Sequence, residues 1–304
     1  MRRLISSLFA LILLLGGGGA ALARQGTPTP FELSPGITAA FSVSVPVDAL
    51  PADSGVVLFA RYRLAPGAEV PASAGQNIAM VYVESGELTL TGNGPASIYR
   101  GGQSQPKAEP NEPGVEEVLA AGDILYSPVC SVTGLRNDGA APLSVLLGGV
   151  TGFGTDTCPG ATPVAESTDN TGLVTDFLAL GQTKPPATLP AQLAIVKATY
   201  APGASDPPGA NSGTVLARVD SGTFSLTMSE GEGTIIRKPA DPSDFFSAQQ
   251  DPLVAGVEAT LNPGDMVWEA GGTSIQGRNS GTEPATVVLF VLVSNPASPA
   301  TPTT

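Results

Sequence analysis

Apolar and polar residues alternate along most of this chain in short segments separated by turns. The alternation has a period of two, which is typical of half-buried β-strands, over residues 56–64, 78–86 and 193–200. Turn sequences such as Glu-Ser-Gly-Glu at 84–87 and Asn-Pro-Gly-Asp at 262–265 close the segments. No long apolar pattern with the helical period of 3.6 residues follows the N-terminal region. The pattern therefore predicts an all-β protein built from many short strands.

The same strand pattern occurs twice. Residues 65–91 align with 201–227 without gaps at an offset of 136, and residues 115–147 align with 257–289 at an offset of 142. The second copy therefore gains six residues between its two blocks, where residues 238–256 are predicted to form an exposed loop. Each copy has the length of one domain, and its strands need a second sheet or closure to bury their apolar side.

The repeat divides the chain into six predicted segments. They are a signal peptide at 1–23, a flexible segment at 24–35, a first barrel at 36–152, a linker at 153–171, a second barrel at 172–294, and a disordered tail rich in Pro and Thr at 295–304.

The N-terminal segment predicts export. Arg2 and Arg3 precede an apolar run from Leu4 to Leu15, and small residues follow up to Ala23. The alternative is an uncleaved membrane anchor, but the run is much shorter than the roughly 20 apolar residues that a membrane span needs. We therefore expect a secreted, periplasmic or cell-surface protein with no membrane contact after cleavage.

Charge excludes some partners. The formal net charge is −13, and it becomes −15 once Arg2 and Arg3 are removed. An acidic surface repels nucleic acid and anionic membranes, so neither is an expected partner. The chain has two cysteines, Cys130 and Cys158, which we expect to form one disulfide in an oxidising compartment. Two unpaired thiols are the alternative, because the sequence does not give their separation.

The glycines of both copies follow the spacing of two known motifs. The first motif reads G-x5-H-x-H-x3-4-E-x6-G and the second G-x5-P-x-G-x2-H-x3-N. In this framework the chain resembles the cupin family, and the resemblance implies two tandem cupin-like jelly-roll β-barrels. Cys130 replaces the second glycine of motif two, and Ala270 replaces its proline. The positions that match are Gly67, Gly86, Gly122, Pro128 and Asn137 in copy one and Gly203, Gly222, Gly264, Gly272 and Asn279 in copy two.

The metal ligands that these motifs specify are replaced in both copies. The sequence contains no histidine, and none of the replacements offers the imidazole, thiolate or carboxylate that binds a transition metal tightly. We therefore expect no metal and no other cofactor. The eight replaced positions hold Ser73, Gly75, Ala79 and Thr133 in copy one and Gly209, Asn211, Val215 and Ile275 in copy two.

Strand alternation places small and apolar residues on the interior face of each barrel, together with Asn77 in copy one and Asn211 in copy two. A filled core is the first interpretation, because small barrels are usually packed. The second is a cavity for a small neutral or apolar ligand. Its predicted contacts are Ser73, Asn77, Thr133, Asn211 and Trp268. An aromatic residue at position 268 is expected first in the core, and the wall of a pocket at the barrel mouth is the second interpretation.

The sequence favours a metal-free protein that binds a small molecule or has a structural role, with no catalytic residues assigned. The alternative is an atypical enzyme that uses carboxylates or a non-standard metal site, and a carboxylate beside Asn77 or Asn211 would favour it. In a purely structural protein, Ile78, Met80 and Tyr82 would pack one barrel against the other or against a second copy of the chain.

Overall fold

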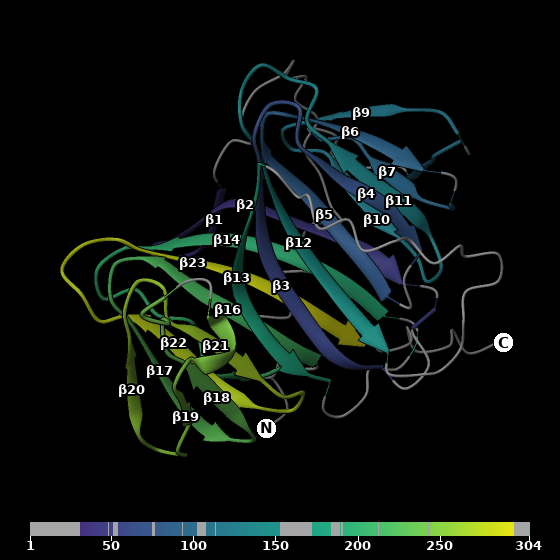
Figure 1. The fold of residues 1–304 in the computed structure, drawn as a ribbon. Helices are drawn as coiled ribbons and strands as arrows, with labels where there is room; N and C mark the ends of the chain where they lie inside the picture. Colours follow the sequence, from purple (N-terminus) through teal and green to yellow (C-terminus); the bar gives the residue numbers. More distant parts are fainter. Residues whose placement is uncertain are drawn as a thin grey trace, which may run out of the picture.

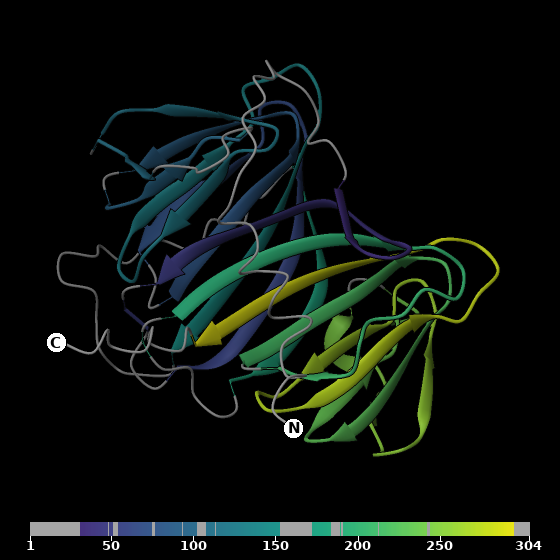
Figure 2. The same ribbon diagram turned by 180° about the vertical axis from the view of Figure 1, so that it is seen from behind.

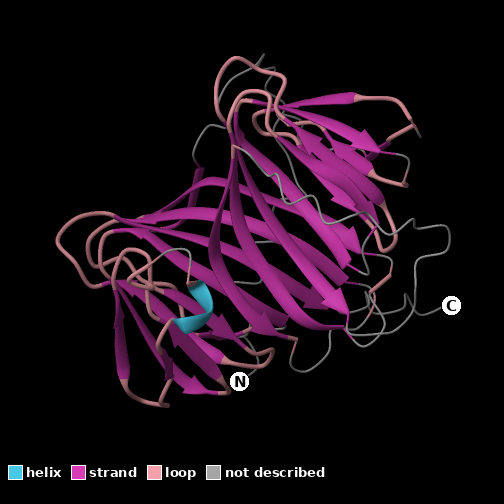
Figure 3. Ribbon diagram, viewed as in Figure 1, coloured by secondary structure: helices cyan, strands magenta, loops and turns pink. Residues whose placement is uncertain are grey.

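The computed structural model describes residues 31–294, with gaps at 48, 51–53, 75–76, 93, 102–107, 113, 153–171, 184–188, 190, 212 and 242–243. The described residues form strands and loops, with one short 3-10 helix, η2 (Phe245–Ser247). Figure 3 shows this all-β architecture, which the alternating pattern predicted. The predicted signal peptide, linker and C-terminal tail lie outside the described residues.

The strands form four sheets. The seven-stranded sheet has the order β13 (Leu173–Gln182), β3 (Ser54–Leu64), β12 (Leu143–Gly152), β5 (Asn77–Ser85), β10 (Ile124–Ser127), β7 (Ser97–Tyr99), β8 (Ala108–Pro110). The eight-stranded sheet has the order β1 (Phe31–Ser34), β2 (Ile37–Val47), β14 (Ala191–Tyr200), β23 (Ala285–Ser294), β16 (Gly213–Ser221), β21 (Met266–Glu269), β18 (Gly233–Ile236), β19 (Gln250–Pro252). The two four-stranded sheets have the orders β4 (Glu69–Ala74), β11 (Val132–Arg136), β6 (Glu87–Gly92), β9 (Glu117–Ala120) and β15 (Gly209–Ala210), β22 (Ser274–Asn279), β17 (Phe224–Glu230), β20 (Glu258–Leu261).

The sheets stack in four layers, with the two large sheets in the middle (Figure 1). The seven-stranded sheet and the first four-stranded sheet form what we call half one, and the eight-stranded sheet and the other four-stranded sheet form half two. Each half is a sandwich of two facing sheets, which is how the jelly roll predicted as a closed barrel is realised here. Each half has its own apolar core, and a third core lies between the halves.

The halves exchange their first strands. β2 begins the first sequence repeat but pairs with β14 in half two, whereas β13 begins the second repeat and pairs with β3 in half one (Figure 2). The spatial halves therefore differ from the sequence repeats by one strand each. The segment predicted to be flexible up to residue 35 is also partly ordered, because Phe31–Ser34 pairs with β2 as strand β1.

The core between the halves confirms that one sandwich packs on the other through β5. Ile78, Met80 and Tyr82 are almost completely buried in this core, and Tyr82 stacks on Phe41 of β2 with ring centroids 4.1 Å apart. Val81 and Val83, on the opposite face of β5, belong to the core of half one. The strand is thus apolar on both faces because each face meets a different core.

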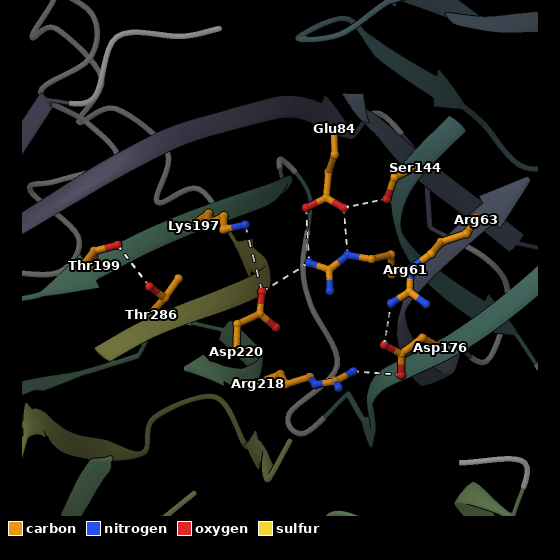
Figure 4. Close-up of polar contacts among 10 residues, drawn as sticks. All are labelled: Arg61, Arg63, Glu84, Ser144, Asp176, Lys197, Thr199, Arg218, Asp220 and Thr286. Carbon is orange, nitrogen blue, oxygen red and sulfur yellow. Dashed lines mark hydrogen bonds and ion pairs between the residues drawn. The ribbon is translucent and has the colours of Figure 1, made fainter. Parts of the chain in front are cut away.

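Ion pairs connect the halves beside this core (Figure 4). The Arg61 guanidinium donates to both carboxylate oxygens of Glu84, at 2.7 and 3.1 Å, and to Asp220 of half two at 3.2 Å. The Lys197 ammonium lies 4.0 Å from the same Asp220 carboxylate. Arg61 and Lys197 occupy equivalent repeat positions, as do Glu84 and Asp220, so the network has approximate two-fold symmetry.

The repeated turns have the structural roles that their residues predict. Asn137 and Asn279 both donate from their side chains to two backbone carbonyls and accept from a glycine N–H two residues later. At the second glycine position of motif two, Gly272 has φ of 87° and its equivalent Cys130 has φ of 64°. The replacement in copy one therefore keeps a left-handed backbone conformation that favours glycine.

Candidate functional site

The four replaced ligand positions of the second repeat come together around one cavity in half two. Gly209, Asn211, Val215 and Ile275 all line it, and the cavity has about 50 Å³ of water-accessible space. β15, β16 and β22 bring these residues to the inside of the sandwich, as the motif spacing implies. The space suffices for a few water molecules or for a ligand of that size.

Two carboxyl groups that the motif does not contain also line this cavity. Asp206 lies in the loop before β15, and Glu269 is the last residue of β21. The Tyr200 hydroxyl donates to the Asp206 carboxylate at 2.9 Å. The Asn211 side-chain amide donates to Glu269, and both residues are only 5% exposed. The remaining wall is mostly apolar, so the carboxyl groups and their two partners form a polar cluster inside a core.

Burial in this core shifts the acidity of the whole cluster. Loss of hydration raises the pKa of Asp206 from 3.8 to about 6, although the hydrogen bond from Tyr200 opposes the shift. Loss of hydration also raises the pKa of Glu269 from 4.5 to about 7, with Asn211 opposing the shift and the Asp206 charge adding to it. The pKa of Tyr200 is raised well above its usual value by the same burial and by Asp206. Both carboxyl groups can therefore gain or lose a proton near neutral pH.

The equivalent positions of the first repeat carry no acid. Val70 corresponds to Asp206, and Ser127 corresponds to Glu269. Val70 packs against the apolar core of half one, and Ser127 is buried at the end of β10. The polar cluster thus distinguishes half two from half one.

The structure contradicts the prediction that Asn77 and Trp268 line a barrel interior. Asn77 is exposed at the start of β5, so it does not reach the core of half one. Trp268 is buried in the core between the halves, where its indole N–H donates to the Gln182 carbonyl at 2.8 Å. Alternation along β21 explains the error, since Glu269 faces the cavity and the preceding side chain must face the other way.

Three of the other predicted positions of copy one lie among the described residues. Ser73 of β4 pairs with Thr133 of β11 across the outer sheet of half one, and Thr133 and Ala79 are partly buried. Gly75 lies outside the described residues. So does Cys158, and its pairing with Cys130 remains a prediction.

The cavity does not fit the metal that the cupin motif normally binds. Of the four motif positions, only Asn211 carries a polar side chain, and it already donates to Glu269. Among the described residues, no group of three or more His, Cys, Asp or Glu side chains lies close enough to hold a metal ion. The donors present are two carboxyl groups bound to an amide and a phenol, which is a weak set for a transition metal.

Sequence reasoning missed Asp206, Glu269 and Tyr200. Comparison of the two repeats contains a signal for the two acids, because a carboxyl side chain stands at a strand or loop position where the other copy has Val70 or Ser127. Tyr200 has no such signal, since an aromatic residue at the end of an apolar strand is equally suited to a core.

Comparison with known proteins finds only distant structural neighbours. Neither a protein-family model nor a curated protein matches the sequence. Solved structures that resemble it include AerE from Microcystis aeruginosa, with 14% identity, 88% of this chain and 98% of that chain covered, and a TM-score of 0.43. Procruciferin, an 11S globulin from Brassica napus, has 12% identity, coverages of 82% and 84%, and a TM-score of 0.39. Oxalate decarboxylase from Bacillus subtilis has 13% identity, coverages of 93% and 80%, and a TM-score of 0.34.

These neighbours are cupin-family proteins with the bicupin architecture, and they include both enzymes and storage globulins. At such identities and TM-scores they say nothing about the activity of this chain, which has to be argued from its own residues. Within the part of the chain that the structure describes, no helix is long and apolar enough to cross a membrane.

Proposed function

We propose that this chain is an exported protein that binds a small neutral molecule, without catalysis, in the cavity of half two. The observation that carries the proposal is the buried Asn211–Glu269 pair, which stands inside the cavity at the place where the cupin motif puts its ligands. A buried carboxyl group that is not needed for packing is costly unless it has a use, because an apolar residue would serve the core better.

The chemistry of the cluster favours a neutral ligand with hydrogen-bonding groups. In their protonated forms Asp206 and Glu269 can each donate and accept a hydrogen bond. Bringing an anion near them would oppose their ionisation, and the acidic surface of the whole chain also disfavours anions. The apolar wall would contact the rest of the ligand. Half one, which lacks both acids, would then serve as a structural support.

Acid–base catalysis is the second candidate, and the pKa values support it. Carboxyl groups with pKa values of about 6 and about 7 in one cavity are suited to exchange protons with a bound molecule near neutral pH. The carboxyl group beside Asn211 is the feature that favours this function over a filled core. The two functions differ in one respect, since an enzyme converts the bound molecule and a binding protein releases it unchanged.

Native mass spectrometry and metal analysis of the exported, untagged protein test the proposal. We expect no stoichiometric metal and a reproducible extra mass, which is lost in Asn211→Ala and retained in Ser127→Ala, the matched control in half one. Stoichiometric metal, or no extra mass in any preparation, would contradict the proposed function. The same spectrum tests export, because a chain cleaved after Ala23 begins at Arg24. Chemical change of the captured molecule on incubation would favour the enzyme.

A further inference from the structure

A larger groove lies on the opposite face of β21, at the seam between the halves. It has about 330 Å³ of water-accessible space, within the range of small-molecule sites. The end of β13 from half one forms one wall, and β18, β19 and η2 from half two form the others. In Figure 3 the short helix of η2 stands beside these strands at the boundary of the two large sheets. The groove is distinct from the cavity, because Trp268 faces the groove and Glu269 faces the cavity.

Aromatic rings form the apolar part of the groove. Trp268 lies at its base, where the would-be Cβ of Gly181 is only 1.8 Å from the indole ring, so the glycine is needed for the ring to sit there. Phe245 and Phe246 form the rim with ring centroids 5.6 Å apart and nearly perpendicular planes. Phe245 is buried against Phe177, whereas Phe246 is 77% exposed. The exposed ring of Phe246 therefore stands next to two further aromatic side chains that line the same groove.

The rim of the groove is built by a segment that is longer in the second repeat than in the first. The segment 238–256, predicted as a loop, contains η2 and β19 and supplies both rim phenylalanines. β19 corresponds to β8 of the first repeat, since each is the edge strand of its sheet. The first repeat keeps an aromatic residue at the position of Trp268, namely Tyr126, which is buried in the core between the halves. The six additional residues of copy two thus lie in the segment that covers Trp268 with a rim.

Polar groups alternate with the rings around the groove. Gln182 and Gln250 are exposed, and Thr234 is partly buried. Their amide and hydroxyl groups both donate and accept hydrogen bonds. The carboxylate of Glu232 also lines the groove and disfavours anions. Flat rings beside neutral planar amides fit a ligand whose own ring has an apolar face and a polar edge.

We propose that this groove binds a neutral saccharide, with the apolar face of one sugar ring against Phe246 and Trp268 and the hydroxyl groups toward Gln182, Gln250 and Thr234. A purely apolar ligand would leave these polar groups without partners, which costs binding free energy. A cation would form an ion pair with only one carboxylate of the groove lining, that of Glu232. The neutral polyhydroxylated ring is the class that uses both kinds of surface.

Tryptophan fluorescence tests the proposal directly, because Trp268 is the only tryptophan of the chain. The full mature protein is titrated with N-acetylglucosamine, maltose and cellobiose. Choline, cyclohexanecarboxylate and cyclohexanol represent cationic, anionic and apolar ligands. We expect a saturable change in Trp268 emission with at least one saccharide and a higher Kd for each of the other three. Phe246→Ala should raise the saccharide Kd about fivefold, the effect of one lost aromatic contact.

Two controls separate this site from other effects. Val254→Ala removes a 56% exposed apolar side chain outside the groove and should leave the saccharide Kd unchanged. Ser127→Ala should also leave it unchanged, since Ser127 lies at the end of β10 in half one and does not line the groove. The proposal is overturned if no saccharide alters the emission, as when a segment of the chain itself or a second copy fills the groove. It is also overturned if choline or cyclohexanol binds more tightly, or if Phe246→Ala binds saccharide like the wild type.

Discussion

Glu269→Gln should make the protein markedly less sensitive to alkaline pH. The substitution keeps the shape of the side chain, and its amide oxygen can still accept the hydrogen bond from Asn211. It removes the only group at this position that can lose a proton. In the wild type, the folded state holds the Glu269 proton up to a pH of about 7, whereas the unfolded chain loses it near 4.5. Stability from this group is therefore complete below pH 4.5 and is lost as the pH rises through 7.

The magnitude follows from the two pKa values. With 1.36 kcal/mol for each pKa unit, the ionisation of Glu269 lowers the free energy of unfolding by about 2–3 kcal/mol between pH 5 and pH 8. Asp206 contributes in the same direction, because its pKa is raised from 3.8 to about 6. Its contribution and that of every other acid are present in both proteins, so they largely cancel when the variant is compared with the wild type.

Urea unfolding at pH 5, 6, 7 and 8 measures this difference. The free energy of unfolding of Glu269→Gln minus that of the wild type should increase by about 2–3 kcal/mol from pH 5 to pH 8. Ser127→Ala, the equivalent position in half one, should differ from the wild type by an amount independent of pH, because neither side chain titrates. A difference for Glu269→Gln that stays constant with pH would refute the reasoning, since the carboxyl group would then be ionised in the folded protein throughout.

Three further variants test the packing. Gly148→Ala should lower the free energy of unfolding, measured with urea, by about 1–3 kcal/mol, because its Cβ would lie 2.1 Å from the buried Phe290 ring. Gly209→Ala is the control, since its Cβ would approach nothing closer than 4.0 Å. Equal losses in the two variants would contradict the prediction. Arg61→Met should lower the free energy of unfolding by about 2–4 kcal/mol, because the Glu84 and Asp220 carboxylates, 14% and 19% exposed, keep their charges but lose the guanidinium. Arg136→Met, which breaks an exposed ion pair, should leave the free energy of unfolding unchanged. In reducing buffer, Cys130→Gly should have a free energy of unfolding about 1 kcal/mol higher than the wild type, because glycine adopts a φ of 64° without strain. In oxidising buffer it should be less stable than the wild type if the predicted disulfide forms. A difference between the variant and the wild type that is the same in both buffers would contradict that pairing.

The sequence predicted what a period-two pattern and a repeat can specify. It placed the strands, the two copies, and the turns of Asn137 and Asn279 correctly, because these depend on local residue preferences. It did not predict the exchange of β2 and β13, since alternation indicates which face of a strand is buried but not which strand it pairs with. Each sequence repeat therefore fails to coincide with a spatial half.

The errors at the candidate site also arise because alternation does not always indicate which way a side chain faces. The sequence of β21, Met-Val-Trp-Glu, is buried at all four positions, so its pattern does not reveal which residues face the cavity. Trp268 was placed inside the sandwich and Glu269 was not considered, although their true orientations are the reverse. Asn77 was placed inside by counting from the motif, but it stands at the exposed end of β5. Ends of strands are where a face predicted by alternation is least reliable.

β21 also explains how the second repeat contributes to both the cavity and the groove, because its residues Trp268 and Glu269 face opposite ways. The corresponding strand of half one, β10, is buried at all four positions as well, with Tyr126 toward the core between the halves and Ser127 at its end. Both strands are thus packed on both faces, although β10 ends in Ser127 and β21 ends in Glu269. A glutamate in place of the serine introduces a titratable group on one face, and the extended segment 238–256 introduces an aromatic rim on the other. Neither change requires a different sheet, because β21 lies between β16 and β18 just as β10 lies between β5 and β7.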